Sequence, residues 1–465
     1  MATRLTRAVV LGLVVLGLSA SPSFAVDPGP DSEQEVLAPD EKGAEQVPAV
    51  PPHIAPSSEQ KYVLWPLQAV DETADNLAGW FGDRGFTISS GLSTAFQWDF
   101  NTPADFKVPF RSLVTNHSRY FVELFQLSLG YNPAPEPGEF GGNVVFDTGQ
   151  IARRIKADWN GSGFVPDTEW EHDEAELQSA YVAYNVPIGN GLTLKGGKFV
   201  TLLGAEVIEP WLNPTFSRSF LFGYAVPFTH VGGYATYPIT DIVSTTLGGV
   251  IGWDNVYDNN SSPSALGQVA VTPNDMFALY VNGIFGPEQT CAPNPGVLPT
   301  LEGMGCNSNY RGVVDVVMSI TPPDVEGLSL LLNYAYGAED EASLVNPGRH
   351  SVWTGFSGIV SFEAIPDYLT LALRGEYFDD PQGSRLRAAN ANLARPSSVD
   401  DIIGVSVWEV TFDAKVMLSD YIYLRGEYRH DEASHPIFTA NPNTATQTSL
   451  WSGQNTVAVE LGYFF

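Results

Sequence analysis

The strongest constraint on this chain is a series of extended segments that runs from about residue 85 to the C-terminus. Along each segment large apolar residues alternate with small, polar or charged ones, and this period of two predicts a β-strand. In the last segment, for example, Val459 and Leu461 share one side while Glu460 lies on the other. The pattern predicts sixteen strands, at residues 86–98, 119–131, 142–156, 175–187, 191–203, 228–238, 242–253, 263–272, 275–286, 310–321, 327–339, 351–364, 368–379, 403–418, 421–432 and 454–465.

The connections between these strands alternate in length. Short ones such as IGNG, PITD and TPND consist of turn-forming residues, whereas long polar loops such as DWNGSGFVPDTEWEHDE join the other strand ends. Short turns at one end and long loops at the other are typical of bacterial outer-membrane barrels. The sequence therefore predicts an all-β fold over residues 85–465, a transmembrane antiparallel β-barrel with short periplasmic turns and long extracellular loops.

A targeting signal precedes the strands. Arg4 and Arg7 come before the apolar run AVVLGLVVLGLSA and the motif SPSFA, which predicts a signal peptide over residues 1–25. Residues 26–60 are rich in Pro, Glu and Ala and predict a disordered acidic tether, and residues 61–84 predict a short periplasmic helical segment. Export favours the lipid-embedded barrel over a soluble β-sandwich, which the alternation alone also fits.

Charge and cysteine content restrict the partners. The chain has 23 Lys and Arg against 53 Asp and Glu, which argues against nucleic acid as a partner because nucleic acid attracts basic surfaces. Its two cysteines, Cys291 and Cys306, lie in one predicted extracellular loop and are expected to form a disulfide in an exported protein. A zinc site would require further ligands nearby. No cofactor is expected.

A more specific resemblance lies between Lys195 and Asn260. The segments GKF, GAEVIE, NPTFSRSFLF, PFTHVGGYATY and GWDNVYDNN are similar to the putative beta-barrel porin-2 family, the OmpL-like porins. The resemblance implies a pore in the cell outer membrane for small hydrophilic solutes, and it offers no catalytic residues to transfer. It also implies that the terminal aromatic residue, Phe465, is the signal read by the barrel-assembly machinery. Whether the barrels form homotrimers stays open.

The loop from Gly204 to Pro227 is long yet unusually apolar, so exposure to water would leave a large apolar surface uncovered. We expect it to fold back against the inner wall and to place Glu206, Glu209 and Arg218 at a pore constriction. Inward strand positions carry nearly balanced charge: Lys195, Asp315, Arg374, Glu376, Glu409, Asp413, Lys415, Arg425, Glu427, Arg429 and Glu460. The acidic outer loops should then make the pore weakly cation-selective, with a preference that fades as salt rises.

Several alternatives remain. An outer-membrane adhesin or scaffold with a plugged lumen would use the same loops, whereas no residue constellation supports an enzyme such as a barrel lipase. His230 lacks a nucleophile setting and is expected to be a hydrogen-bonded structural residue. The acidic run at 167–176 lacks calcium-loop spacing and is expected to be solvated. Strand-end aromatic residues such as Trp253 and Trp353 are expected in the interfacial girdle facing lipid.

Overall fold

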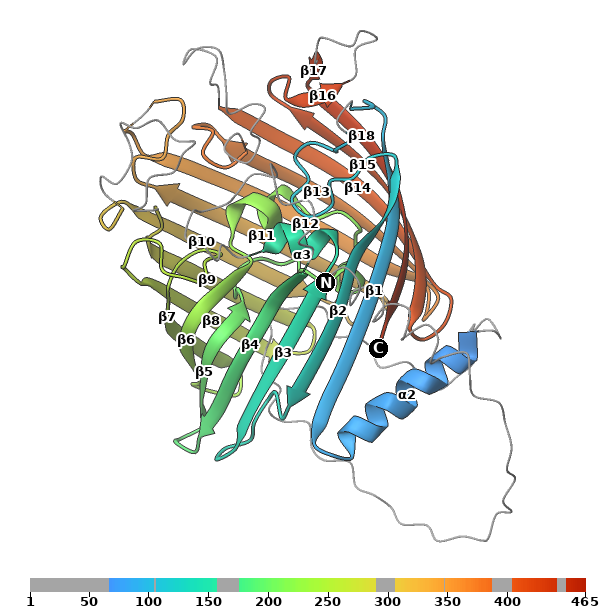
Figure 1. Cartoon of the computed structure of the whole chain (residues 1–465), viewed down its shortest axis with the longest axis vertical. Coiled ribbons are helices and arrows are strands. Elements are labelled where there is room, and N and C mark those ends of the chain that lie inside the picture. The colour runs from blue at the N-terminus through green and yellow to red at the C-terminus, as the bar shows by residue number, and fades with distance from the viewer. Residues whose placement is uncertain are drawn as a thin grey trace, which may run out of the picture.

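The computed structural model describes residues 67–103, 106–156, 175–289, 306–346, 348–386, 404–440 and 449–465. They form a closed antiparallel barrel in which each strand pairs with its sequence neighbours and β1 pairs with β18 to close the ring (Figure 1). The predicted signal peptide (1–25) and tether (26–60), Cys291 and nearly all of the acidic run at 167–176 lie outside the described residues.

Sixteen strands make the barrel. They are β1 (Phe86–Asp99), β2 (Arg119–Tyr131), β3 (Phe140–Thr148), β4 (Ala175–Val186), β5 (Leu192–Val200), β6 (Thr229–Pro238), β7 (Val243–Val250), β8 (Ser264–Asn274), β9 (Phe277–Pro287), β10 (Tyr310–Ile320), β11 (Leu328–Glu339), β12 (Ser351–Ile365), β13 (Leu369–Asp380), β14 (Val405–Met417), β15 (Ile422–Ala433) and β18 (Gly453–Phe464). The predicted all-β antiparallel barrel and its strand number are confirmed.

Two features differ from the predicted strands. The predicted strand at 142–156 ends early, because Gly149 has a φ of 119° and the chain turns into a short helix, α3 (Gln150–Ile155). Ile151, Ala152 and Ile155 are buried on that helix, so its apolar spacing serves a helix rather than a strand. The predicted loop after β15 contains a small hairpin of β16 (Phe438–Ala440) and β17 (Ser449–Trp451).

The two faces of the wall have opposite chemistry. On β13, Leu373 and Tyr377 point outward and are 51% and 50% exposed, whereas Arg374 between them points inward and is 0% exposed. The last strand follows the predicted pattern, with Val459 and Leu461 outward and Glu460 inward. An apolar exterior around a charged interior is the arrangement of a barrel in lipid. Among the described residues, none of the helices has the length and hydrophobicity needed to cross a bilayer.

Helix α2 (Gln68–Gly82) lies at the end of the barrel that carries the short turns, beside the C-terminus (Figure 1). It leads directly into β1 and falls within the predicted helical segment at 61–84. The C-terminal residue completes the closing seam, because Phe465 N–H donates to Ser90 O at 2.9 Å and Ser90 N–H donates to Phe465 O at 3.1 Å.

Candidate functional site: the inner loop

The connection between β5 and β6, residues 201–228, is the feature that most shapes the barrel interior, and we call it the inner loop. It contains two short helical turns, η2 (Pro210–Leu212) and η3 (Leu221–Ala225). Its side chains are mostly buried, and its partners lie on inward-facing positions of β1, β2, β4, β7 to β15 and β18. The inner loop therefore crosses the barrel interior instead of extending outward into water.

Wall carboxylates hold the inner loop by its backbone. Glu376 accepts hydrogen bonds from the N–H groups of Phe220 and Leu221 at 2.7 and 2.6 Å, at the start of η3. Asp413 accepts the N–H of Phe216 at 3.1 Å, and Glu427 accepts the N–H of Ser217 at 2.9 Å. Hydrogen bonds with an ionised partner are roughly twice as strong as neutral ones, so these carboxylates fix the path of the loop.

Wall arginines hold the carbonyl groups of the same loop. Arg374 donates to Ser217 O at 2.5 Å, Arg425 donates to Asn213 O at 2.8 Å, and Arg429 donates to Arg218 O at 2.7 Å. The three guanidinium groups are at most 1% exposed. Charged side chains of the wall therefore bind mainly the backbone of the inner loop.

An apolar belt around the inner wall supports these polar contacts. Eight inward residues, one from each successive strand between β7 and β14, belong to a single buried cluster with the inner loop: Val250, Leu266, Ile284, Val313, Ala335, Trp353, Phe378 and Val407. Leu221 of the loop is 0% exposed, and burial of a side chain of this size contributes about 1.5–3 kcal/mol. The apolar composition seen in the sequence is thus explained by packing against the wall.

Two wall glycines allow this close approach. A Cβ atom on Gly91 of β1 would lie 2.1 Å from the ring of Trp211 in η2. A Cβ atom on Gly355 of β12 would lie 2.3 Å from Leu221 Cδ1. Real Cβ atoms do not come so close to other heavy atoms, so any side chain at either position would displace the inner loop.

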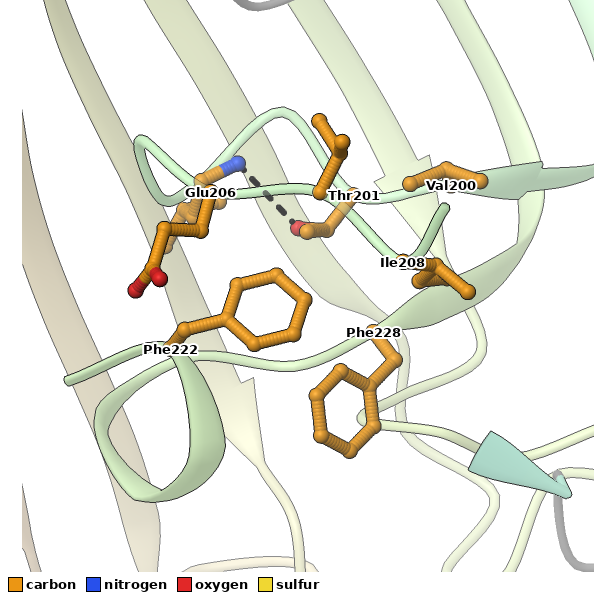
Figure 2. Close-up of a pocket in the computed structure, with 8 residues that line it drawn as sticks. Val200, Thr201, Glu206, Ile208, Phe222 and Phe228 are labelled. Atoms are coloured by element: carbon orange, nitrogen blue, oxygen red, sulfur yellow. Dashed lines mark hydrogen bonds between the residues drawn. The ribbon is translucent and has the colours of Figure 1, made fainter. Parts of the chain in front are cut away.

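The packing leaves little empty space beneath the loop. Figure 2 shows a cavity beside Thr201, Ile208 and the rings of Phe222 and Phe228. Its volume is about 10 Å³, which is close to the space for one water molecule. This cavity therefore holds no more than about one water molecule.

The three predicted constriction residues have different environments. Glu206 is buried and receives a hydrogen bond from Arg374 at 2.9 Å. Arg218 is 4% exposed, and it donates to carbonyl oxygens of its own loop, which include Val207 O at 2.9 Å. Glu209 is only half-buried and accepts from the amide groups of Gln126 and Gln178. Of the three, only Glu209 keeps substantial contact with solvent.

The predicted lumen-lining residues all point inward, but most of them do not face water. Nine are at most 6% exposed and lie beneath loops or against other wall residues: Asp315, Arg374, Glu376, Glu409, Asp413, Arg425, Glu427, Arg429 and Glu460. Lys195 and Lys415 are half-buried, and each ammonium group lies over a tyrosine ring. Alternation fixes the side on which a residue lies, whereas the inner loop decides whether solvent reaches it.

The expected girdle positions of two tryptophans are wrong. Trp353 points inward, is 0% exposed, and donates from Nε1 to Ala225 O at 3.2 Å. Trp253 lies after β7 and packs against the buried cluster of the inner loop. His230 has the expected structural role, since its ring nitrogens lie 2.9 Å from Gly252 O and 3.1 Å from Thr201 Oγ1.

A second inward loop was not predicted. Residues 106–118, in the connection between β1 and β2, bury Phe110 and Leu113, and Arg111 pairs with Asp431 of β15 at 2.7 Å. Arg154 of α3 donates to Ser112 O at 3.0 Å. The apolar segment KVPFRSLV could have revealed this loop by the same argument that identified the inner loop.

The loops also contain a disulfide-bonded cysteine and a carboxyl group with a raised pKa. Cys306 is disulfide-bonded, and its predicted partner Cys291 lies outside the described residues. Asp254, which follows β7, accepts the N–H groups of Phe228 and Thr229 at 2.7 and 2.9 Å, and burial raises its pKa to about 6. In the part of the chain that the structure describes, no three His, Cys, Asp or Glu residues are grouped to hold a metal ion.

Comparison with known proteins places this architecture in a family. Residues 85–465 match the family described as "Putative beta-barrel porin-2, OmpL-like". Comparison with curated proteins gives no match. The chain is similar to the solved structure of OprB from Pseudomonas putida, with 9% identity, a TM-score of 0.51, and coverage of 84% of this chain and 97% of that one.

It is also similar to OmpT of Vibrio cholerae in its trimer form, with 11% identity, a TM-score of 0.50, and coverage of 82% of this chain and 99% of that one. At these identities the two structures support the fold alone. The family match covers the whole barrel, from the first strand to the terminal residue. The chain therefore belongs to the Putative beta-barrel porin-2, OmpL-like family, and it is a porin of the outer membrane.

Proposed function

We propose that this porin is a weakly cation-selective diffusion channel for small hydrophilic solutes, and that the inner loop sets its permeability. The observation that carries the proposal is the loop itself, which crosses the interior and is held by wall carboxylates and arginines. A solute that crosses the barrel must pass this loop or move it. No catalytic group is required for that activity.

Charge supports the cation preference. The chain carries a formal net charge of −30, and most inward charges of the wall are paired with the inner loop or with one another. Paired buried charges give a weak net field, so acidic groups in contact with solvent should dominate selectivity. Salt screens such groups beyond about 10 Å at 0.1 M, which would make the preference fade at high salt.

Reversal potentials across planar bilayers test this proposal. In a potassium chloride gradient, the wild type should prefer potassium, and Glu209→Gln should reduce the preference because Glu209 is half-exposed beside the loop. Glu206→Gln should change it less, because Glu206 is paired with Arg374. Glu363→Gln removes a half-buried carboxylate from the inner face of β12, away from the inner loop, and shows how much a wall charge outside the loop contributes. An anion-selective wild type would overturn the proposal.

A second candidate, a plugged barrel that serves as an adhesin or scaffold, is favoured by one observation. Nine predicted lumen-lining charges are at most 6% exposed. A plugged barrel would give no single-channel current in bilayers even after long recording, whereas a diffusion channel gives discrete steps. Single-channel recordings on the purified protein therefore distinguish the two functions.

Assembly is also a proposal. The relative from Vibrio cholerae is described as a trimer, which supports a homotrimer here. The family match supports the role of Phe465 as the terminal signal for the barrel-assembly machinery. The mass of the detergent-solubilised complex, measured by light scattering with the detergent contribution subtracted, should correspond to three chains. A single chain per particle would contradict the trimer.

A further inference from the structure

Helix α2 is fixed along the periplasmic rim of the barrel by acidic side chains. Asp71 accepts a hydrogen bond from Ser419 Oγ at 2.8 Å, and Asp75 is hydrogen-bonded to the hydroxyl of Tyr421. Both partners belong to the turn between β14 and β15. At its other end α2 leads into β1, so its 15 residues, about 22 Å of helix, follow the rim past the end of β18.

The rest of the helix surface is divided into two flanks. At about 100° per residue, Val70, Leu77 and Phe81 fall on one side of the face that contacts the barrel, and Glu72 and Asn76 fall on the other. Trp80 lies between the two flanks and points away from the barrel. Val70 and Leu77 are 37% and 40% exposed, and Trp80 is 52% exposed. A helix that lies in a membrane interface has this division, with one flank toward acyl chains and the other toward water.

The apolar flank continues onto the lipid-facing side of the barrel. Phe86, Tyr131 and Phe140 point outward at the periplasmic ends of β1, β2 and β3 and are 39%, 52% and 68% exposed. Together with Gly82 and Gly85 they line an open groove of about 690 Å³ at the C-terminal end of α2. The exterior of the barrel is its interface with lipid, and the groove joins this surface to the C-terminal end of α2.

The charge of α2 limits which lipid headgroups the helix can contact. The helix contains three acidic residues, Asp71, Glu72 and Asp75, and no basic residue between Gln68 and Gly82. Arg84, just beyond the helix, lies over the ring of Trp80 at 3.9 Å and donates to Trp80 O at 2.6 Å. An acidic helix is repelled by anionic headgroups and tolerates zwitterionic ones.

We propose that α2 is an interfacial helix that embeds Val70 and Leu77 in the periplasmic leaflet, at zwitterionic phospholipid headgroups. The helix thereby extends the lipid contact of the barrel beyond its wall. It also holds the start of the barrel domain at the membrane surface, on the side where Asp71 and Asp75 bind the β14–β15 turn.

Site-specific fluorescence tests this proposal. Leu77→Cys and Asn76→Cys variants of the full chain are labelled with an environment-sensitive dye and placed in phosphatidylcholine nanodiscs. Heat-modifiable migration must first show that each variant has a folded barrel, and unmodified protein reports background labelling. Nitroxide-labelled phosphatidylcholine should quench the dye at L77C several-fold more than the dye at N76C. Equal, weak quenching at the two positions would overturn the proposal.

Two additional measurements separate lipid from other occupants. Replacement of one-third of the lipid by phosphatidylglycerol should reduce quenching at L77C, and high salt should restore it. An Asp71→Ala change should also reduce quenching, whereas Glu72→Ala, which removes the same charge from the exposed side, should not. Efficient disulfide cross-linking of L77C between two chains, without lipid quenching, would assign the flank to a second copy and refute the lipid contact.

Discussion

Glu376 offers the sharpest test of how the inner loop is held. Its two carboxylate oxygens accept the N–H groups of Phe220 and Leu221, at 2.7 and 2.6 Å, in a fully buried site. A Glu376→Gln change keeps one acceptor and turns an amide NH₂ group toward the second backbone N–H. A buried donor without an acceptor costs about 1–3 kcal/mol, in addition to the loss of charge assistance.

A loss of about 2–3 kcal/mol in the docking free energy raises the population of the undocked loop about 30- to 150-fold. We expect Glu376→Gln to increase the frequency of high-conductance events by that order in single-channel recordings. Ser219, which is 3% exposed, provides a second readout. In a Ser219→Cys background, maleimide labelling of the new thiol should accelerate to a similar extent.

Glu363→Gln is the matched control, because Glu363 is half-buried on the inner face of β12 and its backbone N–H donates to Gly327 O, outside the inner loop. It should leave both conductance and labelling near those of the wild type. Wild-type conductance and labelling in Glu376→Gln would refute the idea that wall carboxylates control the loop. Unfolding of the barrel would instead appear as lost heat-modifiable migration, which separates a folding defect from loop release.

Three other predictions follow from the contacts. Gly91→Ala should displace Trp211 and raise conductance, because a Cβ atom there would lie 2.1 Å from the ring, whereas Gly426→Ala, with no atom within 4 Å, should behave as the wild type. The pKa of Asp254 is raised from 3.8 to about 6, so its stabilising contribution is complete below pH 3.8 and is lost as the pH rises through 6. Between pH 3.5 and 7.5, the free energy of unfolding measured by thermal denaturation should therefore change by about 3 kcal/mol less in Asp254→Asn than in the wild type. Deletion of Phe465 should lower the amount of heat-modifiable barrel in outer membranes. An unchanged amount would show that Phe465 only pairs with Ser90 at the end of the last strand and is not an assembly signal.

The sequence by itself determined the barrel because its signals are local. Alternation along each strand identifies the outward and inward positions, as for Leu373 and Arg374, and turn residues mark where strands end. The burial of the inner loop could also be predicted, because so many large apolar residues in one loop must pack against another part of the protein. These features depend on neighbours in sequence and need no knowledge of distant segments.

Only the tertiary structure decided what the inward residues contact. Glu206 and Arg374 are 168 residues apart in sequence, and their pairing requires the closed ring to bring β13 opposite the inner loop. The same packing buries Trp353, which alternation could place on a side but not beneath a loop. The helix α3 after the turn at Gly149 also has a partner in the loop at 106–118, since Arg154 donates to Ser112 O. Solvent exposure inside a barrel is a property of the enclosed volume and of everything that fills it, so no strand pattern could supply it.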